Sequence, residues 1–433
     1  MPLAAPDYAF AAPFQHPPAS PIRSLMPYAM RPGTISLAGG YPAQELFDVE
    51  GLAAASRQVL ERLGACLQYS NIDGQASLRH ELARLSAARG LHCDADTELA
   101  VTGGSQQALA LLARVMLQPG DAAVIETPAF PNSVQALRYT GAAVHTVPSG
   151  PSGIDLDALD ALAARVRPKM VCVVASFSNP CGATISRERR LRLLELAVRH
   201  RFLIVEDDPY GELRFAGETV PPIAALAEGQ ARHWAVYISS MSKTMAPALR
   251  IGWVVAPAEV RRRVVGAKAA DDMACSAWTQ EMVAQVPGRR PLCAACAAHS
   301  RRLRRALRRH GRGAATRAGR PGRVSQTRGG HVLLGAPERR YRRDAPAALR
   351  YRARSRLCAG QGVLRRPGPG RSPCLAHVVR HHERDADRAG HRAPGPRAAG
   401  LRGQRAGIDF AGGLRPPAYG SNARLFAGAW RAG

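Results

Sequence analysis

The stretch of sequence that decides the fold is RERRLRLLELAVRHRFLIVEDDPYGEL, residues 187–213. Its first part, RERRLRLLELAVRHR, predicts an amphipathic helix. The second part opens on the continuous apolar run FLIV and ends in acidic residues, which predicts a strand buried on both faces. A helix followed directly by a buried strand is typical of a mainly parallel sheet that is covered by helices.

The same alternation recurs along the chain. TELAVTGGSQQALALLARVML predicts a short strand, a glycine turn and a helix, and apolar residues at helical spacing predict helices over residues 52–63 and 77–88. Further strands are predicted in DAAVIETPAF, MVCVVASFSNPCG and WAVYISSMSK. The sequence therefore predicts an α/β fold with a mainly parallel sheet between helices.

Polar clusters follow four of the predicted elements, at residues 104–106, 178–179, 207–210 and 240–243. In sheets of this kind ligands bind at the carboxyl ends of the strands. We therefore expect the four clusters to form one site.

Taken singly, each cluster has an ordinary structural explanation. The glycine turn before Ser105 and Gln106 suits a phosphate at a helix N-terminus, but it is also typical of a capped helix. Asp207 and Tyr210 can reach one bound ring, or they form a strand-terminal turn. Asn179 precedes a proline, which is typical of a turn, and it can equally donate to a ligand oxygen.

Lys243 favours the ligand-binding explanation over the structural one. An isolated lysine is usually solvated, whereas this one follows the apolar strand WAVYIS directly, where burial lowers the pKa of an amine and makes it nucleophilic. Ser240, Ser242 and Arg250 can complete a phosphate-binding cup. A lysine, an acid–tyrosine pair, an amide and a phosphate cup together suit an aldehyde cofactor with a phosphate and a basic ring nitrogen, and pyridoxal phosphate has these groups.

The order and wording of these segments resemble a known family. The resemblance rests on ISLAGGYPAQELFD (residues 35–48), LQYSNIDGQASLRHEL, VTGGSQQAL, ETPAFP, SFSNPCGATIS, VEDDPYGELRF and SSMSKTMAPALRIGW. In this order they resemble the fold type I pyridoxal-phosphate aminotransferases of class I/II, and most closely the branch with 2-aminoadipate and aromatic aminotransferases. This implies transfer of an amino group from an amino acid to a 2-oxo acid.

The resemblance also implies a role for each matching residue. Lys243 forms the internal Schiff base and moves a proton, Asp207 pairs with the pyridine nitrogen, Asn179 and Tyr210 bond the ring hydroxyl, and Phe130 stacks on the ring. The implied phosphate ligands are Ser105, Gln106, Ser240, Ser242 and Arg250.

Three further positions carry expectations from the family. Gly40 matches a glycine near the substrate carboxylate. Tyr69 matches a tyrosine that reaches the cofactor of the neighbouring subunit, which implies a homodimer. Cys181 stands where the family usually has threonine, and we expect little effect because cysteine is small.

The charge of the chain is divided unevenly. Its net charge is +27, but residues 1–286 hold 26 Lys and Arg against 27 Asp and Glu, whereas residues 287–433 hold 34 Arg, no Lys and 6 acids. We therefore divide the chain into an N-terminal arm (residues 1–34), a cofactor-binding large domain (residues 35–286) and an arginine-rich tail (residues 287–433). The tail stands where the family has a small domain with a carboxylate-binding arginine, and we expect it to be irregular or disordered.

Three explanations are open for this tail. A reading-frame slip in a GC-rich gene produces such Arg, Ala, Gly and Pro runs. A disordered basic tail can bind nucleic acid through phosphate contacts. A divergent folded domain is the third explanation. In the first case the chain is a remnant of doubtful activity.

Other functions share some of these sequence features. A lyase or decarboxylase on the same fold shares the cofactor motifs. A transcription regulator would need a winged helix before residue 35, for which the sequence shows no room. Cys293 and Cys296 form one CxxC without a second ligand pair, so no metal is expected. Scattered cysteines and no signal peptide or membrane-spanning run favour the cytoplasm.

Overall fold

The computed structural model describes residues 8–15, 27, 40–42, 44, 47–61, 66–214 and 217–286, together with the backbone of three short strands further on. The chain divides into two compact units, Met1–His382 and Glu383–Gly433, and all described residues belong to the first. The prediction of an irregular tail therefore lies largely outside the described residues. In that region β9 (Val324–Ser325), β10 (Val332–Gly335) and β11 (Leu375–Val378) pair as a small antiparallel sheet.

The large sheet has the strand order β1-β8-β7-β6-β5-β2-β3-β4. Its strands are β1 (Leu99–Thr102), β2 (Ala122–Thr127), β3 (Ala143–Gly150), β4 (Gly153–Ile154), β5 (Met170–Val173), β6 (Leu203–Asp207), β7 (Ala235–Ser240) and β8 (Gly252–Val255). β3, β2, β5, β6 and β7 run parallel, each to the next. The predicted mainly parallel sheet is thus confirmed. The strands β3, β4 and β8 were not predicted, and β8 is antiparallel to both β1 and β7.

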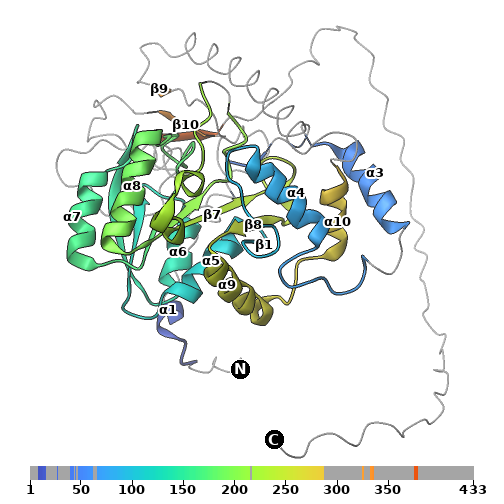
Figure 1. Ribbon diagram of the computed structural model, residues 1–433, viewed down its shortest axis with the longest axis horizontal. Helices are drawn as coiled ribbons and strands as arrows, with labels where there is room; N and C mark the ends of the chain where they lie inside the picture. Colours follow the sequence, from blue (N-terminus) through green and yellow to red (C-terminus); the bar gives the residue numbers. More distant parts are fainter. Residues whose placement is uncertain are drawn as a thin grey trace, which may run out of the picture. The chain divides into compact units, whose positions relative to one another are not determined.

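Helices cover both faces of this sheet (Figure 1). α5 (Ser105–Met116), α6 (Pro131–Arg138) and α9 (Ala258–Asp271) pack on one face. α7 (Leu156–Val166) and α8 (Arg187–His200) pack on the other. Alternate residues of the central strands face the two layers, so Leu203 and Val205 of β6 join the first core and Ile204 joins the second. Burial on both faces explains the continuous apolar runs of these strands.

The stretch at residues 187–213 folds as predicted. Ser186 caps α8, because its side chain accepts from the Arg189 N–H, a preferred arrangement at helix N-termini. Arg201 ends the helix in the left-handed conformation. The chain then enters β6, which is buried until it reaches Asp207 at the edge.

A second helical group packs beside β1 and β8. It comprises α4 (Ala76–Ala87) and α10 (Ala277–Gln285), whose apolar side chains meet those of β1 and β8 in a third core, and α3 (Val49–Leu60), which packs on α10. The predicted helices at residues 52–63 and 77–88 correspond to α3 and α4. In the N-terminal arm, the short helix α1 (Ala12–Gln15) stacks Phe14 on Tyr139 at 4.7 Å between ring centroids.

The register of β8 brings two of the polar clusters together. Gly252 lies opposite Thr102 of β1 and opposite Ser240 of β7. A Cβ atom on Gly252 would lie 2.5 Å from the backbone of Gly104, far inside van der Waals contact. Only glycine permits this approach, so β8 places the turn after β1 next to the end of β7.

Candidate active site

Lys243 lies in the turn after β7 and is the only one of the chain's three lysines without an acidic partner in the described residues. Lys169 is exposed and bonds Asp121 at 2.7 Å. Lys268 is fully buried and bonds Asp272 at 2.6 Å. The Lys243 ammonium instead donates to the backbone oxygen of Gly40 at 2.9 Å. Burial without a counter-charge lowers the pKa of Lys243 to about 8.

The glycine turn, Gly103 and Gly104, opens α5 at the same edge of the sheet. Gly104 has φ of 101° and provides α5 with no side-chain cap. The first N–H groups of a helix lack intrahelical partners and attract anions. Ser105, the first residue of α5, therefore stands at a position suited to a phosphate.

Arg250 borders this turn and ties it to the serines after β7. Its guanidinium donates to the Gly103 oxygen and, at 3.4 Å, to the Ser242 hydroxyl. The Ser240 hydroxyl lies 2.9 Å from the Ser242 hydroxyl and donates to the Ile251 oxygen at 3.2 Å. Cationic and hydroxyl donors thus surround one end of α5.

Gln106, the second residue of α5, has a hydrogen bond outside the glycine turn. Its amide nitrogen donates to the backbone oxygen of Asn132 at 3.1 Å. The side chain therefore connects α5 to the first turn of α6 in this structure.

Asp207 lies at the end of β6 with one carboxyl oxygen, Oδ1, buried and without a hydrogen-bond partner in the described residues. Burial, and then the charge of Asp208, raise the pKa of Asp207 to about 7, while Ser105 acts in the opposite direction. A buried carboxylate oxygen without a partner is costly, so this position suits a cationic or N–H group of a ligand.

Tyr210, Asn179 and Phe130 stand around Asp207. Burial, followed by the charge of Asp207, raises the pKa of the buried Tyr210 to about 12, and a hydrogen bond with Asn179 opposes that shift. Phe130 and Asp207 line one small pocket between β5, β6 and α6. The structure therefore brings the predicted ring-binding residues together.

Tyr69 is the one predicted site residue that lies apart. Its side chain is 79% exposed, and Leu67 beside it is also exposed. It reaches no other predicted site residue through the hydrogen bonds of the described chain. Cys181, the departure from the family pattern, is partly buried two residues after Asn179.

A buried layer of charges behind the site was not predicted from the sequence. Arg89 pairs with Asp208 and donates to the Tyr237 hydroxyl at 3.0 Å. Arg190 pairs with Glu206 at 3.3 Å, both side chains being fully buried. In the sequence, only the acidic run EDD at the end of β6 hinted at these buried charges. Arg89 and Arg190 gave no such hint, because arginines beside or within a helix are usually solvated.

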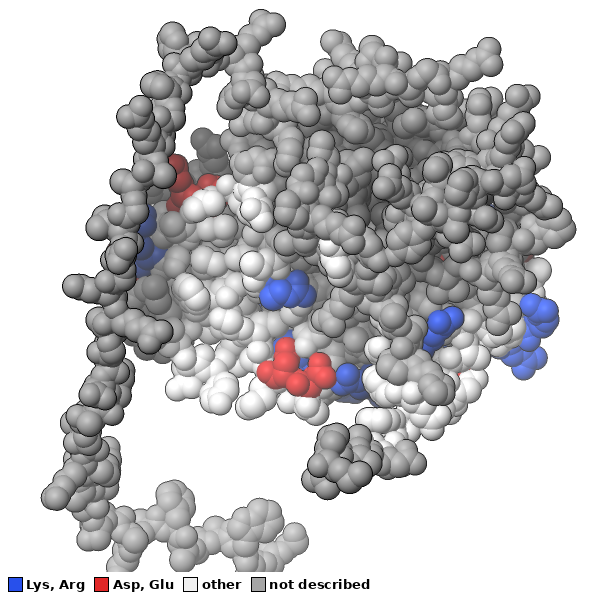
Figure 2. Space-filling model, turned by 180° about the vertical axis from the view of Figure 1, so that it is seen from behind, with Lys and Arg blue, Asp and Glu red and all other residues white. Residues whose placement is uncertain are grey.

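The described residues show neither a membrane-spanning helix nor a metal-binding cluster. No helix among them is long and apolar enough to span a bilayer. No group of three or more His, Cys, Asp or Glu in that part of the chain could hold a metal ion, and Cys293 and Cys296 lie outside it. On the face shown in Figure 2, the described surface carries few and scattered charges rather than a basic patch.

Lys243, whose pKa is lowered by burial, thus lies at the carboxyl edge of a mainly parallel sheet near the uncapped N-terminus of α5, which is where α/β enzymes of this architecture bind their ligands. The family pattern described as aminotransferase class I and II matches residues 34–313. The chain belongs to this family. The match extends past Val286, where the sequence analysis ended the resemblance.

Individual relatives support this assignment. The chain is 37% identical over 266 residues to 2-aminoadipate transaminase of Thermus thermophilus, covering 61% of this chain and 66% of that protein. It is 38% identical over 269 residues to aromatic-amino-acid aminotransferase 1 of Thermococcus litoralis, covering 60% and 64%. The chain therefore spans less than two thirds of the length of these curated relatives.

A solved structure shows the same fold. The α-aminoadipate aminotransferase of Thermus thermophilus, solved with N-(5'-phosphopyridoxyl)-L-leucine, superposes with a TM-score of 0.71 at 29% identity. The superposition covers 83% of this chain and 90% of that one.

Proposed function

We propose that this chain is a pyridoxal-phosphate-dependent aminotransferase, which moves an amino group from an amino acid to a 2-oxo acid. The observation that carries the proposal is Lys243, a buried amine without a counter-charge, next to the unpartnered Asp207 oxygen and the Arg250-bordered glycine turn. These three features fit the aldehyde, the basic ring nitrogen and the phosphate of pyridoxal phosphate. When bound, this cofactor supplies an electron-accepting ring and a carbonyl group that takes up the amino group.

Each of the predicted residues has a proposed role toward the cofactor or the substrate. Lys243 would be the attachment point of the cofactor aldehyde, and its free amine would hold and return the proton at the substrate Cα. Asp207 holds the ring nitrogen protonated, and that pairing lowers the pKa of its own carboxyl again. Asn179 and Tyr210 bond the ring hydroxyl, and Phe130 covers the ring.

The remaining predicted ligands bind phosphate or lie at the subunit boundary. Ser105, Gln106, Ser240, Ser242 and Arg250 would hold the phosphate. Gly40 lies beside Lys243, where a substrate carboxylate would enter. We also propose a homodimer, in which the exposed Tyr69 reaches the site of the partner subunit, and residues 35–286 as the cofactor-binding domain.

Transfer is distinguished from lyase or decarboxylase chemistry by stoichiometry. With cofactor-loaded chain and L-2-aminoadipate or an aromatic amino acid, but no acceptor, we expect no more than one 2-oxo acid per bound cofactor. Adding a 2-oxo acid acceptor should start turnover. Continued product release without an acceptor, or release of carbon dioxide, would identify the alternative reaction.

Asp207→Asn is expected to slow this half-reaction on the order of 10²-fold, because the variant no longer stabilises the positive charge of the ring nitrogen in the transition state. Asp157→Asn, in the first turn of α7 and away from the site, is the matched control. Single-turnover absorbance with both variants measures the effect. An Asp207→Asn rate within twofold of the control would contradict the assigned role.

The pH dependence of cofactor attachment should reflect the lowered pKa of Lys243. The neutral amine is the nucleophile, so the rate constant should rise about tenfold per pH unit below about pH 8 and level off above it. Attachment to N-acetyl-lysine under the same conditions is the control for the ionisation of the cofactor itself. A rate that keeps rising to the pKa of an ordinary lysine, about 10.4, would contradict the burial argument.

A further inference from the structure

The glycine turn is held from behind by Gln107, which stands within the motif VTGGSQQAL but has no role among the predicted or proposed site residues. Gln107 is the third residue of α5, and its Oε1 accepts from the Gly103 N–H at 2.6 Å. The Gly103 oxygen meanwhile accepts from Arg250. Both polar backbone atoms of Gly103 are therefore bonded to side chains, directly before α5, whose N-cap Gly104 provides no side-chain hydrogen bond.

The other end of Gln107 is anchored in the C-terminal end of α9. Its Nε2 donates to Asp272 at 2.8 Å and lies 3.3 Å from a carboxyl oxygen of Asp271. The second oxygen of Asp272 accepts from Lys268 at 2.6 Å. Lys268 is fully buried, and a buried ammonium needs its partner, so Lys268 fixes the orientation of Asp272.

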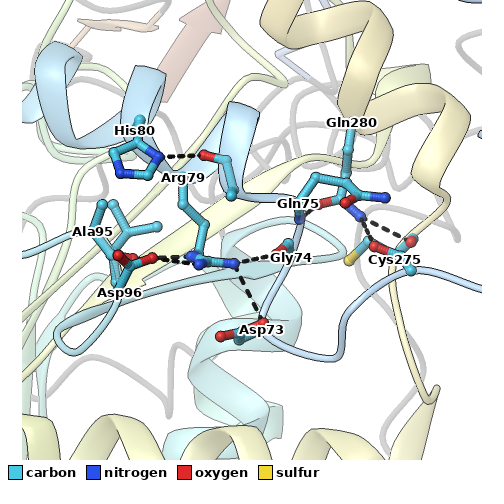
Figure 3. Close-up of polar contacts among 12 residues, drawn as sticks. Asp73, Gly74, Gln75, Arg79, His80, Ala95, Asp96, Cys275 and Gln280 are labelled. Carbon is cyan, nitrogen blue, oxygen red and sulfur yellow. Dashed lines mark hydrogen bonds and ion pairs between the residues drawn. The ribbon is translucent and has the colours of Figure 1, made fainter.

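The loop that carries Asp272 is also held at its far end, by Gln280 of α10 (Figure 3). The Gln280 amide nitrogen donates to the Cys275 oxygen and to the Ser70 hydroxyl, each at 2.9 Å. Its oxygen accepts from the Gln75 N–H at 2.8 Å. Gln280 is fully buried, so it holds the loop between α9 and α10 at Cys275, three residues beyond Asp272.

From these contacts we propose that Gln107, anchored by Asp272 and Lys268, is a positioning residue that shapes the glycine turn for the cofactor phosphate. The inference rests on the proposed function. Gly104 has a φ of 101°, and glycine has more backbone freedom than any other residue. Hydrogen bonds from outside the turn are therefore needed to hold its shape. The hydrogen bonds of Gln107 reach neither Lys243 nor Asp207, which leaves the covalent and ring contacts independent of it.

The test compares two ligands that differ only in the phosphate. Pyridoxal phosphate and pyridoxal are titrated into the full chain, and dissociation constants are measured by absorbance. Gln107→Met, which keeps the length of the side chain and loses its hydrogen bonds, is expected to weaken pyridoxal phosphate about tenfold, the equivalent of one lost hydrogen bond. Pyridoxal should change less than twofold. Asp272→Asn, which removes the charge that Lys268 holds, should weaken pyridoxal phosphate severalfold.

Gln118→Met is the matched control, because Gln118 is exposed and beyond the far end of α5. Melting temperatures without ligand establish that each variant is folded. Equal weakening of both ligands would assign Gln107 a general structural role and overturn the proposal, as would unchanged binding of pyridoxal phosphate. A wild-type chain that binds neither ligand through Lys243 would instead overturn the proposed function itself.

Discussion

Lys243→Ala is expected to abolish the near-visible absorbance band of bound pyridoxal phosphate. Among the three lysines, Lys243 alone is buried without an acidic partner in the described residues, and its pKa is lowered. Lys169 and Lys268 are each paired with an aspartate, so we expect neither to attack the aldehyde. Residual amino-group transfer should fall by on the order of 10²–10⁴-fold, since the proton carrier is lost along with the attachment point.

Lys169→Ala is the control, because Lys169 is half-exposed and paired with Asp121. It should keep both band and activity. Borohydride reduction followed by peptide mapping identifies the attachment site directly, as only three lysines compete. A cofactor adduct on Lys169 or Lys268, or a band that persists in Lys243→Ala, would refute the assignment.

Arg190→Leu is expected to lower the free energy of unfolding by about 3–5 kcal/mol, because it leaves a buried charge without its partner. Both Arg190 and Glu206 are completely buried. Arg190 also donates to the backbone oxygens of Ile185, Ala175 and Pro221 at 2.8–3.0 Å. Urea denaturation of the full chain measures the loss.

Arg192→Leu is the matched control, because it makes the same substitution two residues further along α8. Its partner Asp157 is exposed, and exposed ion pairs contribute about 0–1 kcal/mol. The double variant Arg190→Leu/Glu206→Gln should recover part of the stability, because no charge remains buried. If Arg190→Leu were no more destabilising than Arg192→Leu, the buried pair would not support the fold.

The pH dependence follows from Glu206. Burial raises its pKa from 4.5 to about 7, and Arg190 acts against that shift. An acid whose pKa is higher in the folded than in the unfolded state contributes stability that is fully present below the unfolded pKa. This stability is lost as the pH rises through the folded pKa. Arg190→Leu removes the opposing charge, so its deficit relative to wild type should be smaller at low pH than above about pH 7.

The sequence predicted the parallel strands β2, β5, β6 and β7 because strands buried on both faces must be apolar throughout. The parallel strand β3 was not predicted, because it is largely exposed or half-buried and carries no continuous apolar run. FLIV became β6, and the helix before it became α8 with its cap at Ser186. The antiparallel strand β8 escaped prediction, because pairing direction depends on partners that are distant in the sequence. Its effect is nonetheless central, since Gly252 brings the glycine turn against the end of β7.

The sequence by itself determined which residue types stand at the ends of strands, among them Lys243, Asp207, Asn179 and the glycine turn. Only the tertiary structure decided how they are supported. Arg89, Arg190 and Lys268 look like solvated charges in the sequence, but folding buries them and pairs them with Asp208, Glu206 and Asp272. Folding likewise brings the partly buried Gln107 to the Gly103 N–H. The physical reason is that a local pattern specifies an element and its apolar face, whereas the partner of a buried charge is set by which elements pack together.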